Sequence, residues 1–490
     1  MVQPDLKEIL KRWPSPVDFY RERDNRTELE VGGLSEYANR RIEILVDPDA
    51  AHSPTIQRIA LVACNLTARW ARRVQVRLPH MELHPLLQRD SLRLLEDRII
   101  NEMRLADPFG HFEIQNINSP GEVGAVEDTL RLYVGPWRAG GNFSDDDYLI
   151  HANSWSAITK RGRALAPFED AEATVAAAGL AASIGVADLF KRAILHPRSQ
   201  WIPSLAWSTW SHTLTDSEGY SSHTFEMDVP EVLDLGRTLL AGVGAIGSTI
   251  LYLADLISVK GYLHLLDRDR VELTNLNRSP MFYVQHVLAN MFKTEAATRF
   301  LAGRGLDVQA TNGTWHEVGA DLLGQSFDVL ISLTNEDSAW AELPFQMPPL
   351  ILHGTTTSGW GFGAGRHIPK IEDCTLCRMP RPTVEFRGPC AEGEIETVVP
   401  AGAARASLPF LSAASASLLL AEFLKLNCTS VTQLANDISA DFRYGLPAVI
   451  AVRRVNDPAC RGCRASHLPA FHISRGGGRY SSYSEGISAS

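Results

Sequence analysis

Apolar and polar residues alternate along this chain in a strand–helix rhythm that begins near residue 41. Strict alternation is typical of half-buried strands, whereas the apolar residues from Ile56 to Trp70 recur at helical spacing, after Ser53 as N-cap and Pro54 in the first turn. In this first stretch, strands are predicted at 41–46, 74–78, 130–134 and 147–152, and helices at 54–70 and 171–195. Elements that alternate in this way predict an α/β fold.

The same rhythm restarts in the second half of the chain. Strands are predicted at 237–241, 263–266 and 327–332, and a long helix at 408–426. Two short echoes occur in the same order in both halves, because 149–152 resembles 352–354 and 187–191 resembles 421–425. We therefore predict a duplicated unit of about 230 residues, which gives an α/β protein of two tandem Rossmann-like halves.

Composition narrows the classes of function. The chain has 490 residues, of which 45% are hydrophobic and 21% charged, and this length exceeds one ordinary domain. A formal net charge of −10 disfavours nucleic acid and anionic membranes as partners. No apolar run reaches the roughly 18 residues of a spanning helix, and the first ten residues carry Asp5, Lys7 and Glu8 in place of a secretory apolar segment. We expect a cytoplasmic protein with no nucleic-acid or membrane partner.

A glycine loop directly after the predicted strand 237–241 carries the first candidate chemistry. Gly242, Gly244 and Gly247 have the spacing of the dinucleotide-binding fingerprint, in which glycines permit a tight turn, close approach of a phosphate and helix packing. Asp267 follows the next strand, where a carboxylate can accept both ribose hydroxyls. By itself this pattern favours an NAD-dependent oxidoreductase.

A polar cluster beyond Asp267 indicates a nucleoside triphosphate instead. The chain continues with Asp269, Asn275 and Arg278, and Lys293 lies on a predicted helix. An amide can bond ribose or phosphate oxygens, a guanidinium can fork onto phosphate, and an ammonium adds a point charge. A dehydrogenase has no need of such a cluster, whereas ATP offers a partner to each of these groups.

These residues resemble the E1-like superfamily, which includes ubiquitin-activating enzymes and the ThiF–MoeB enzymes that adenylate sulfur-carrier proteins. The resemblance rests on the glycine loop, on Asp267 with Asp269, and on the run from Asn275 to Arg278, and it covers 237–463. It implies that ATP and Mg²⁺ are used and that the two halves pack as a pseudo-dimer. It also implies ribose binding by Asp267 and contacts to the triphosphate by Asn275, Arg278 and Lys293.

One position departs from the family pattern. After the strand 327–332 the family places an aspartate that helps to hold Mg²⁺ near the α-phosphate, whereas this chain has Asn335, followed by Glu336 and Asp337. An amide is a poorer ligand for a hard cation than a carboxylate. Either Asp337 or Glu336 reaches the metal instead, or adenylation is impaired, and we favour Asp337.

Four of the seven cysteines form two CxxC pairs, which are Cys374 with Cys377 and Cys460 with Cys463. Four thiolates suit tetrahedral Zn²⁺, and a complete Cys₄ shell leaves no open position for chemistry. The sequence therefore predicts a structural zinc site in a reducing compartment rather than a disulfide framework.

A fifth cysteine, Cys390, lies in a loop with glycine and proline neighbours, between the first CxxC pair and the predicted helix 408–426. Such a loop exposes a thiol more readily than a core does. In relatives this loop carries the cysteine that attacks the acyl adenylate, so the resemblance implies that Cys390 forms a thioester. Cys64 and Cys428 lie in apolar settings and are expected to be packing residues.

The expected reaction follows from the resemblance. The C-terminal glycine carboxylate of a ubiquitin-like protein attacks ATP to give an acyl adenylate, and Cys390 then takes the acyl group for transfer to an E2-like conjugating protein. The layout resembles the E1 components of bacterial ubiquitin-like conjugation operons, some of which serve antiphage defence. The expected parts are an unassigned segment at 1–40, a divergent inactive adenylation-like domain at 41–230, an active one at 231–470 and a flexible tail at 471–490.

Several alternatives stay open at this point. The chain could be a sulfur-carrier adenylyltransferase, a non-catalytic scaffold that binds the carrier, or an NAD-dependent oxidoreductase. The sequence also leaves open whether two chains form a homodimer. The family often takes an arginine for the triphosphate from the opposite half, and the candidate sources are Arg21, Arg23 and Arg26.

Overall fold

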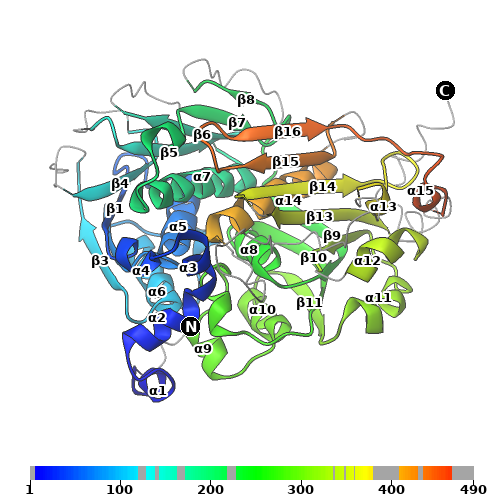
Figure 1. Ribbon diagram of the computed structural model, residues 1–490, viewed down its shortest axis with the longest axis horizontal. Helices are drawn as coiled ribbons and strands as arrows, with labels where there is room; N and C mark the ends of the chain where they lie inside the picture. Colours follow the sequence, from blue (N-terminus) through cyan, green and yellow to red (C-terminus); the bar gives the residue numbers. More distant parts are fainter. Residues whose placement is uncertain are drawn as a thin grey trace.

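The computed structural model describes most of the chain in stretches separated by short gaps. The described residues are 6–119, 128–137, 143–162, 172–217, 228–334, 337–346, 349–357, 359–378, 408–428 and 434–465. Within them, two eight-stranded sheets and the helices between them account for the architecture (Figure 1).

The first sheet has the strand order β3-β2-β1-β4-β5-β6-β7-β8. Neighbouring strands from β3 to β5 are parallel, and those from β5 to β8 are antiparallel. Its strands are β1 (Arg41–Val46), β2 (Arg73–Leu78), β3 (His111–Asn116), β4 (Thr129–Val134), β5 (Tyr148–Asn153), β6 (Ser156–Arg161), β7 (Leu205–Ser208) and β8 (Leu214–Thr215).

The second sheet repeats this order as β11-β10-β9-β12-β13-β14-β15-β16, again parallel in the first part and antiparallel in the second. The repeated order confirms the prediction of two tandem Rossmann-like halves. Its strands are β9 (Val232–Ala241), β10 (Ser258–Leu266), β11 (Leu306–Thr311), β12 (Val329–Ser332), β13 (Leu350–Thr357), β14 (Gly361–His367), β15 (Asp437–Asp441) and β16 (Ala448–Val452).

Helices connect the strands and cover the sheets. In the first half they are α1 (Leu6–Arg12), α2 (Pro16–Arg23), α3 (Asn25–Val31), α4 (Leu34–Tyr37), α5 (Pro54–Ala68), η1 (Pro85–Leu87), α6 (Leu95–Ala106), α7 (Val175–Ala193) and η3 (Arg198–Gln200). In the second half they are α8 (Ala245–Ala254), η5 (Leu273–Asn275), α9 (Val284–Leu288), α10 (Lys293–Leu301), α11 (Trp315–Leu323), α12 (Asp337–Glu342), η6 (Leu343–Phe345), α13 (Thr375–Arg378), α14 (Pro409–Cys428) and α15 (Arg461–Ala465).

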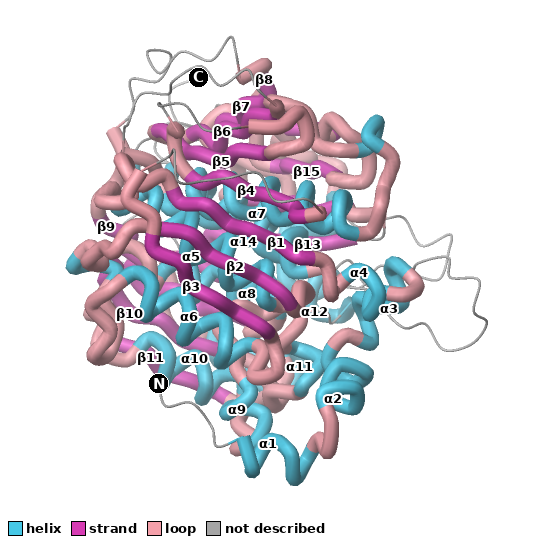
Figure 2. The backbone as a smooth tube through the Cα atoms, turned by 90° about the vertical axis from the view of Figure 1, so that its left-hand side faces the viewer, coloured by secondary structure: helices cyan, strands magenta, loops and turns pink. Residues whose placement is uncertain are grey.

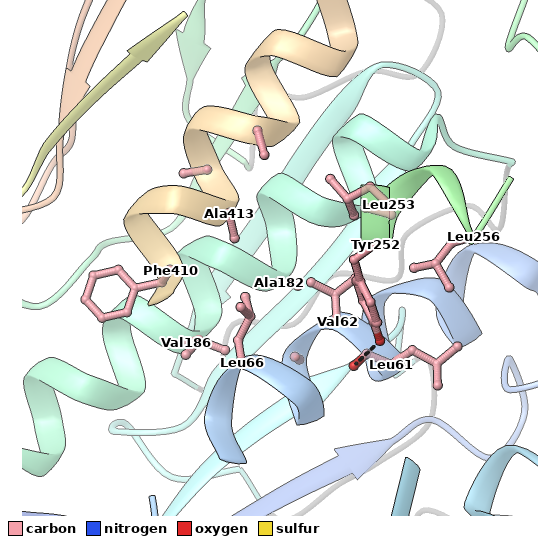
Figure 3. Packing of buried hydrophobic residues seen from close by; sticks show 14 of the residues in the cluster. Leu61, Val62, Leu66, Ala182, Val186, Tyr252, Leu253, Leu256, Phe410 and Ala413 are labelled. Atoms are coloured by element: carbon pink, nitrogen blue, oxygen red, sulfur yellow. Dashed lines mark hydrogen bonds between the residues drawn. The ribbon is translucent and has the colours of Figure 1, made fainter. Parts of the chain in front are cut away.

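The two halves meet through four helices that lie between the sheets. Helices α5 and α7 of the first half pack on α8 and α14 of the second, so the layers run sheet, helix pair, helix pair, sheet (Figures 1 and 2). Leu66, Val186, Leu253 and Ala413 are among the buried side chains that fill this interface (Figure 3). The halves therefore share one continuous hydrophobic core and form a pseudo-dimer within one chain.

Small residues let α7 and α14 approach closely. A Cβ atom added at Gly179 of α7 would lie 2.6 Å from Oγ of Ser417 on α14. Such close approach explains why both helices are rich in alanine and serine, since larger side chains would force the halves apart.

Helix α14 corrects one sequence expectation. Among the described residues it is long and apolar enough to cross a membrane by length and composition, although no spanning run was expected. Its apolar window is entirely buried between the two halves, and it carries Glu422 and Lys425 inside the protein. The helix is therefore explained as the core helix that packs against α7.

Most predicted elements lie where the hydrophobic pattern placed them, with shifts at their ends. The helix expected at 171–195 is Val175–Ala193, and the strand expected at 237–241 extends back to Val232. The segment 1–40, which the sequence did not assign, contains four short helices, and α2 packs on η5 of the second half. The tail 471–490 lies outside the described residues.

A buried group of charges joins the first half to α14. His212 Nε2 lies 2.7 Å from Glu422 Oε1 and 3.0 Å from Lys425 Nζ, and Arg366 also pairs with Glu422. Burial, and then the Lys425 charge, lower the pKa of His212 to about 4. Burial also lowers the pKa of His286 in α9 to about 4, with the nearby arginines adding to the effect.

We expect the free energy of unfolding to fall as the pH drops from 7 to 5. The folded-state pKa of each histidine lies below its unfolded value of about 6.5, so the unfolded chain binds more protons in this window. Each of the two histidines should lower the free energy of unfolding by on the order of 2 kcal/mol between pH 7 and pH 5. Urea unfolding at both pH values measures the slope, which His212→Gln should flatten.

A slope that is the same in His212→Gln and in the unmodified chain would contradict the assignment.

Candidate functional site

The glycine loop after β9 forms the turn that the fingerprint predicts. Gly242 has a φ of +100°, and an added Cβ would lie 2.6 Å from the carbonyl oxygen of Leu333, so a side chain fits neither the backbone nor the space. A Cβ at Gly247 would lie 2.3 Å from the carbonyl oxygen of Gly242. The close packing of α8 on the loop therefore requires a glycine at this position.

Gly244 differs from the other two glycines. It is the N-cap of α8, and an added Cβ would meet no protein atom within 4 Å. Packing within the chain therefore does not demand a glycine there. A bare backbone at a helix N-terminus is suited to an approaching anion.

Asp267 follows the last residue of β10 and is held firmly in place. Its Oδ2 accepts a hydrogen bond from the Val243 amide at 2.7 Å, and its Oδ1 accepts one from the Asp269 amide at 2.8 Å. Burial raises the pKa of Asp267, and the charge of Lys293 opposes this effect. The carboxylate thus ties the glycine loop to the loop after β10.

Lys293 reaches the same place from the first residue of α10. Its Nζ lies 2.7 Å from Asp269 Oδ2 and 3.9 Å from Asp267 Oδ1, and its side chain is largely buried whereas that of Asp269 is exposed. The carbonyl of Asp269 also accepts a hydrogen bond from the Lys293 amide at 2.9 Å, which fixes the start of the helix. A cation is therefore positioned beside the carboxylate.

These groups line one pocket at the carboxyl ends of β9, β10 and β12. Open parallel sheets bind ligands at this edge. The lining consists of Gly242, Gly244, Leu266, Asp267, Arg268, Asp269, Lys293, Gly313, Trp315, Leu333 and Thr334.

Trp315, Leu333 and Thr334 also line the pocket, although they were not predicted from the sequence. A signal for Trp315 was present, because Thr314 and Glu317 form a capping box that marks the start of α11 just after β11. Leu333 and Thr334 directly follow β12 and were identifiable only as residues at a strand end.

Two residues predicted for the phosphates lie beside the pocket rather than in its lining. Asn275 ends η5, where its Oδ1 accepts a hydrogen bond from the Glu272 amide at 2.9 Å. Arg278 is buried, and its Nη1 donates to the Thr274 carbonyl at 3.2 Å. Both side chains therefore help to shape the turn after Asp269.

The corresponding edge of the first sheet lacks these groups within the described residues. The chain follows the same path there, with Pro79 after β2 where Asp267 follows β10, and Leu95 opening α6 where Lys293 opens α10. Matching bridges close the two loops, Glu82 with Leu94 and Arg270 with Phe292.

The loop from β1 to α5 is also longer than the glycine loop, and it bonds to the segment after β4. Asp47 there accepts a hydrogen bond from the Trp137 amide at 2.6 Å. In the described part of the chain, the carboxylate, the lysine and the glycine turn therefore come together in the second half alone.

The N-terminal helices exclude one of the three candidate arginines. Arg23 is completely buried and pairs with Asp24 at 2.6 Å and Asp107 at 2.7 Å, so it is not available to a ligand. Arg21 is exposed and lies 3.4 Å from Asp18. Arg26 adjoins Thr27, whose Oγ1 accepts a hydrogen bond from Asn277 at 3.1 Å, so α3 touches the loop beside Arg278.

The four CxxC cysteines converge although 86 residues separate the two pairs. The distances between sulfur atoms are 3.8 Å for Cys374–Cys377, 3.8 Å for Cys374–Cys460 and 3.4 Å for Cys377–Cys463. A tetrahedral zinc with bonds of about 2.3 Å places its sulfur ligands about 3.8 Å apart. The cluster therefore has the composition and the size of a Cys₄ metal site.

Several predicted residues cannot be placed. Cys390 and Asn335 lie outside the described residues, and of Asp337 only the backbone at the start of α12 is described. Cys64 is buried in the core, as predicted for a packing residue. Cys428 ends α14, where its thiol donates to the Leu424 carbonyl at 3.3 Å.

Comparison with known proteins agrees with the geometry of the pocket. Residues 221–436, somewhat less than half of the chain, match the ThiF family. The uncharacterised protein y4jF of Sinorhizobium fredii (strain NBRC 101917 / NGR234) is 30% identical over 252 residues, which cover 48% of this chain and 44% of that protein. The chain thus spans less than half the length of this relative.

The solved structures that comparison finds include two crystal structures of E. coli MccB. The structure with SeMet MccA is 16% identical, covers 47% of this chain and 67% of that one, and has a TM-score of 0.37. The structure with MccA-N7isoASN is 13% identical, covers 64% and 96%, and has a TM-score of 0.36.

The ThiF match contains the glycine loop, Asp267 and Lys293, all of which line the pocket described above. The second half of the chain therefore contains a region that matches the ThiF family, as its glycine loop and Asp267 predicted.

Proposed function

We propose that this chain is a cytoplasmic E1-like enzyme that activates the C-terminal glycine of a ubiquitin-like protein with ATP. One observation carries the proposal: the open backbone at Gly244, the carboxylate of Asp267 and the ammonium of Lys293 meet in one pocket of the region that matches the ThiF family. In this proposal 41–230 is the inactive adenylation-like domain and 231–470 the active one, flanked by 1–40 and 471–490.

The pocket suits the parts of ATP in order. Asp267 is fixed by two backbone amides and retains lone pairs for ribose hydroxyls. The N-terminus of α8 at Gly244 presents amides to a phosphate. Lys293 would exchange its contact with Asp269 for a phosphate oxygen, and Asn275 and Arg278 would contact the triphosphate from the neighbouring turn.

The proposed reaction has two steps. A carboxylate oxygen of the terminal glycine attacks the α-phosphorus of ATP, the bond to pyrophosphate breaks, and an acyl adenylate and pyrophosphate result. The thiolate of Cys390 then attacks the acyl carbonyl, AMP leaves, and the resulting thioester is passed to an E2-like protein. The site positions the reactants and neutralises charge on the phosphates.

Two metals complete the proposal. Mg²⁺ would neutralise phosphate charge, with Asn335 and Asp337 as its candidate ligands. Zn²⁺ would join Cys374, Cys377, Cys460 and Cys463, and it would tie α13 to α15 without taking part in the chemistry.

Exchange of labelled pyrophosphate into ATP tests the first step separately from the second. With a panel of glycine-ended ubiquitin-like proteins, we expect exchange in the unmodified chain and in Cys390→Ala, because adenylation precedes the thiol step. In the unmodified chain the thioester is seen on a denaturing gel as a band that reducing agent removes. Cys390→Ala should lack this band. Cys64 is buried in the core. Cys428→Ser serves as the control variant, which should keep both pyrophosphate exchange and thioester formation.

Loss of exchange in Cys390→Ala would contradict the order of steps. Binding of NAD in preference to ATP by the unmodified chain would overturn the proposed function itself.

A further inference from the structure

The loop between β10 and α10 is longer than its counterpart between β2 and α6. Matching hydrogen bonds mark both loops, from the Leu83 amide to the Arg93 carbonyl and from the Val271 amide to the Met291 carbonyl. Between the latter two residues the second half has η5 and α9, where the shorter loop of the first half has η1. We call residues 273–290 the insertion loop, and it contains Asn275 and Arg278.

Arg69 of the first half penetrates the insertion loop. It is the C-cap of α5 and is completely buried. Its Nη1 donates to the carbonyls of Leu276 at 3.0 Å and Phe282 at 2.7 Å, and its Nη2 donates to that of Pro280 at 2.6 Å. One guanidinium thus holds three carbonyls of a loop more than two hundred positions away in sequence.

The surroundings of Arg69 fix the guanidinium in turn. Asn65, one turn earlier on α5, accepts from Arg69 Nε at 3.0 Å and donates to the Pro280 carbonyl at 3.2 Å. The guanidinium also lies over the ring of Tyr283, 5.4 Å from its centroid. A planar donor fork held at several points can define the path of a loop, which a single ammonium cannot do.

The contact has a reciprocal counterpart on the second half. Asp255 is the C-cap of α8, which follows β9 as α5 follows β1. It is buried and pairs with two residues of the first half, Arg89 at 2.7 Å and Arg98 at 2.9 Å. The C-terminal ends of the two equivalent helices, α5 and α8, therefore play matching parts. The end of α5 holds the loop after β10, and the end of α8 holds the loop after β2 and the start of α6.

We propose that Arg69 is a positioning residue for adenylation: the inactive half uses it to hold the insertion loop in the shape that presents Arg278 and Asn275 to the triphosphate. This inference rests on the proposed ATP site, which lies where the loop leaves Asp269. It gives the first half, which has no such site among its described residues, an indirect part in the reaction, through the insertion loop.

Arg58 provides a matched control. It lies on the same helix, is buried, and also crosses between the halves, but its Nε donates to the Leu256 carbonyl at 2.9 Å, away from the insertion loop. Arg58→Ala should therefore weaken contact between the halves without releasing the loop.

Hydrogen exchange of the nucleotide-free chain tests the contact without ATP. In Arg69→Ala the amides of 273–290 should exchange at least about tenfold faster than in the unmodified chain, and Arg58→Ala should leave their rates unchanged. Arg69→Lys keeps a positive charge but cannot hold three carbonyls at once, so the loop should exchange at an intermediate rate. If Arg69→Ala does not fold, Arg69→Lys decides the result.

Binding of the fluorescent analogue mant-ATP with Mg²⁺, and the kinetics of pyrophosphate exchange, test the consequence. Arg69→Ala and Arg69→Lys should weaken mant-ATP binding and lower kcat, even at temperatures at which both variants are fully folded. Arg58→Ala should lower the melting temperature but leave mant-ATP binding and kcat unchanged. Unchanged loop exchange in Arg69→Lys, or equal effects of the changes at Arg58 and Arg69, would overturn the proposal. Failure of the unmodified chain to bind mant-ATP would instead contradict the proposed ATP site. The hydrogen-exchange result would still show whether Arg69 holds the insertion loop.

Discussion

Lys293→Ala is expected to weaken ATP binding by about 10- to 100-fold, because charge-assisted hydrogen bonds contribute roughly 1.5–3 kcal/mol. Its Nζ lies between Asp267 and Asp269 at the wall of the pocket, where a phosphate oxygen could replace the contact with Asp269. Equilibrium titration with mant-ATP and Mg²⁺ measures the dissociation constant.

The helix that carries Lys293 supplies its own control. Arg299 lies on α10 with an exposed side chain that pairs with Glu295 at 2.7 Å, so Arg299→Ala removes a positive charge from the same helix away from the pocket. An equal loss of affinity in both variants would show a general effect of charge and would contradict a phosphate contact by Lys293.

Asp267→Asn should weaken ATP binding still more than Lys293→Ala, although aspartate and asparagine side chains have nearly the same volume. Both carboxylate oxygens accept backbone amides, and an amide group can accept only one of these bonds while its NH₂ faces the other donor. The glycine loop and the ribose site should therefore be lost together, which would be seen as absent mant-ATP binding in a protein that still folds.

Removal of the metal from the four-cysteine cluster should produce a large loss of stability. Structural zinc sites contribute on the order of 10 kcal/mol to the folding of small domains, and here one cluster joins two segments of the second half. We expect one zinc per chain by elemental analysis. We also expect Cys460→Ser or strong chelation to lower the melting temperature and to speed hydrogen exchange in α13 and α15.

Cys428→Ser is the corresponding control, because its hydroxyl can keep the hydrogen bond to the Leu424 carbonyl and the residue lies outside the cluster. It should retain the full zinc content. A chain that contains no zinc when purified from zinc-containing medium, or that loses no stability on chelation, would contradict a structural metal.

The architecture was largely predictable from the sequence, because hydrophobic periodicity records which face of each element is buried. The strand predicted at 41–46 and the helix start at Pro54 agree with β1 and α5. The antiparallel strands β14, β15 and β16 were not predicted, since glycine-rich and exposed strands lack a clear alternation. The short helices before residue 40 also escaped prediction, and one of them, α2, packs on η5 of the second half.

The candidate site was only partly predictable. Glycine spacing identified Gly242, and its distance from a strand end identified Asp267, because both signals are local in sequence. Trp315 and Leu333 reach the pocket from later strand ends, and their position depends on the order of strands in the sheet. Asn275 and Arg278 were assigned to the phosphates, whereas the structure places them in the turn beside the lining.

By itself the sequence determined the kind of protein this is: a duplicated α/β chain whose second copy retains a nucleotide fingerprint and two cysteine pairs. These features lie within short stretches, where spacing and periodicity express local geometry. Only the tertiary structure decided how the halves depend on each other. The contacts of Arg69 with the insertion loop and the convergence of four sulfur atoms join residues far apart in sequence. Such contacts arise when buried polar groups find partners across a shared core, and no local pattern encodes them.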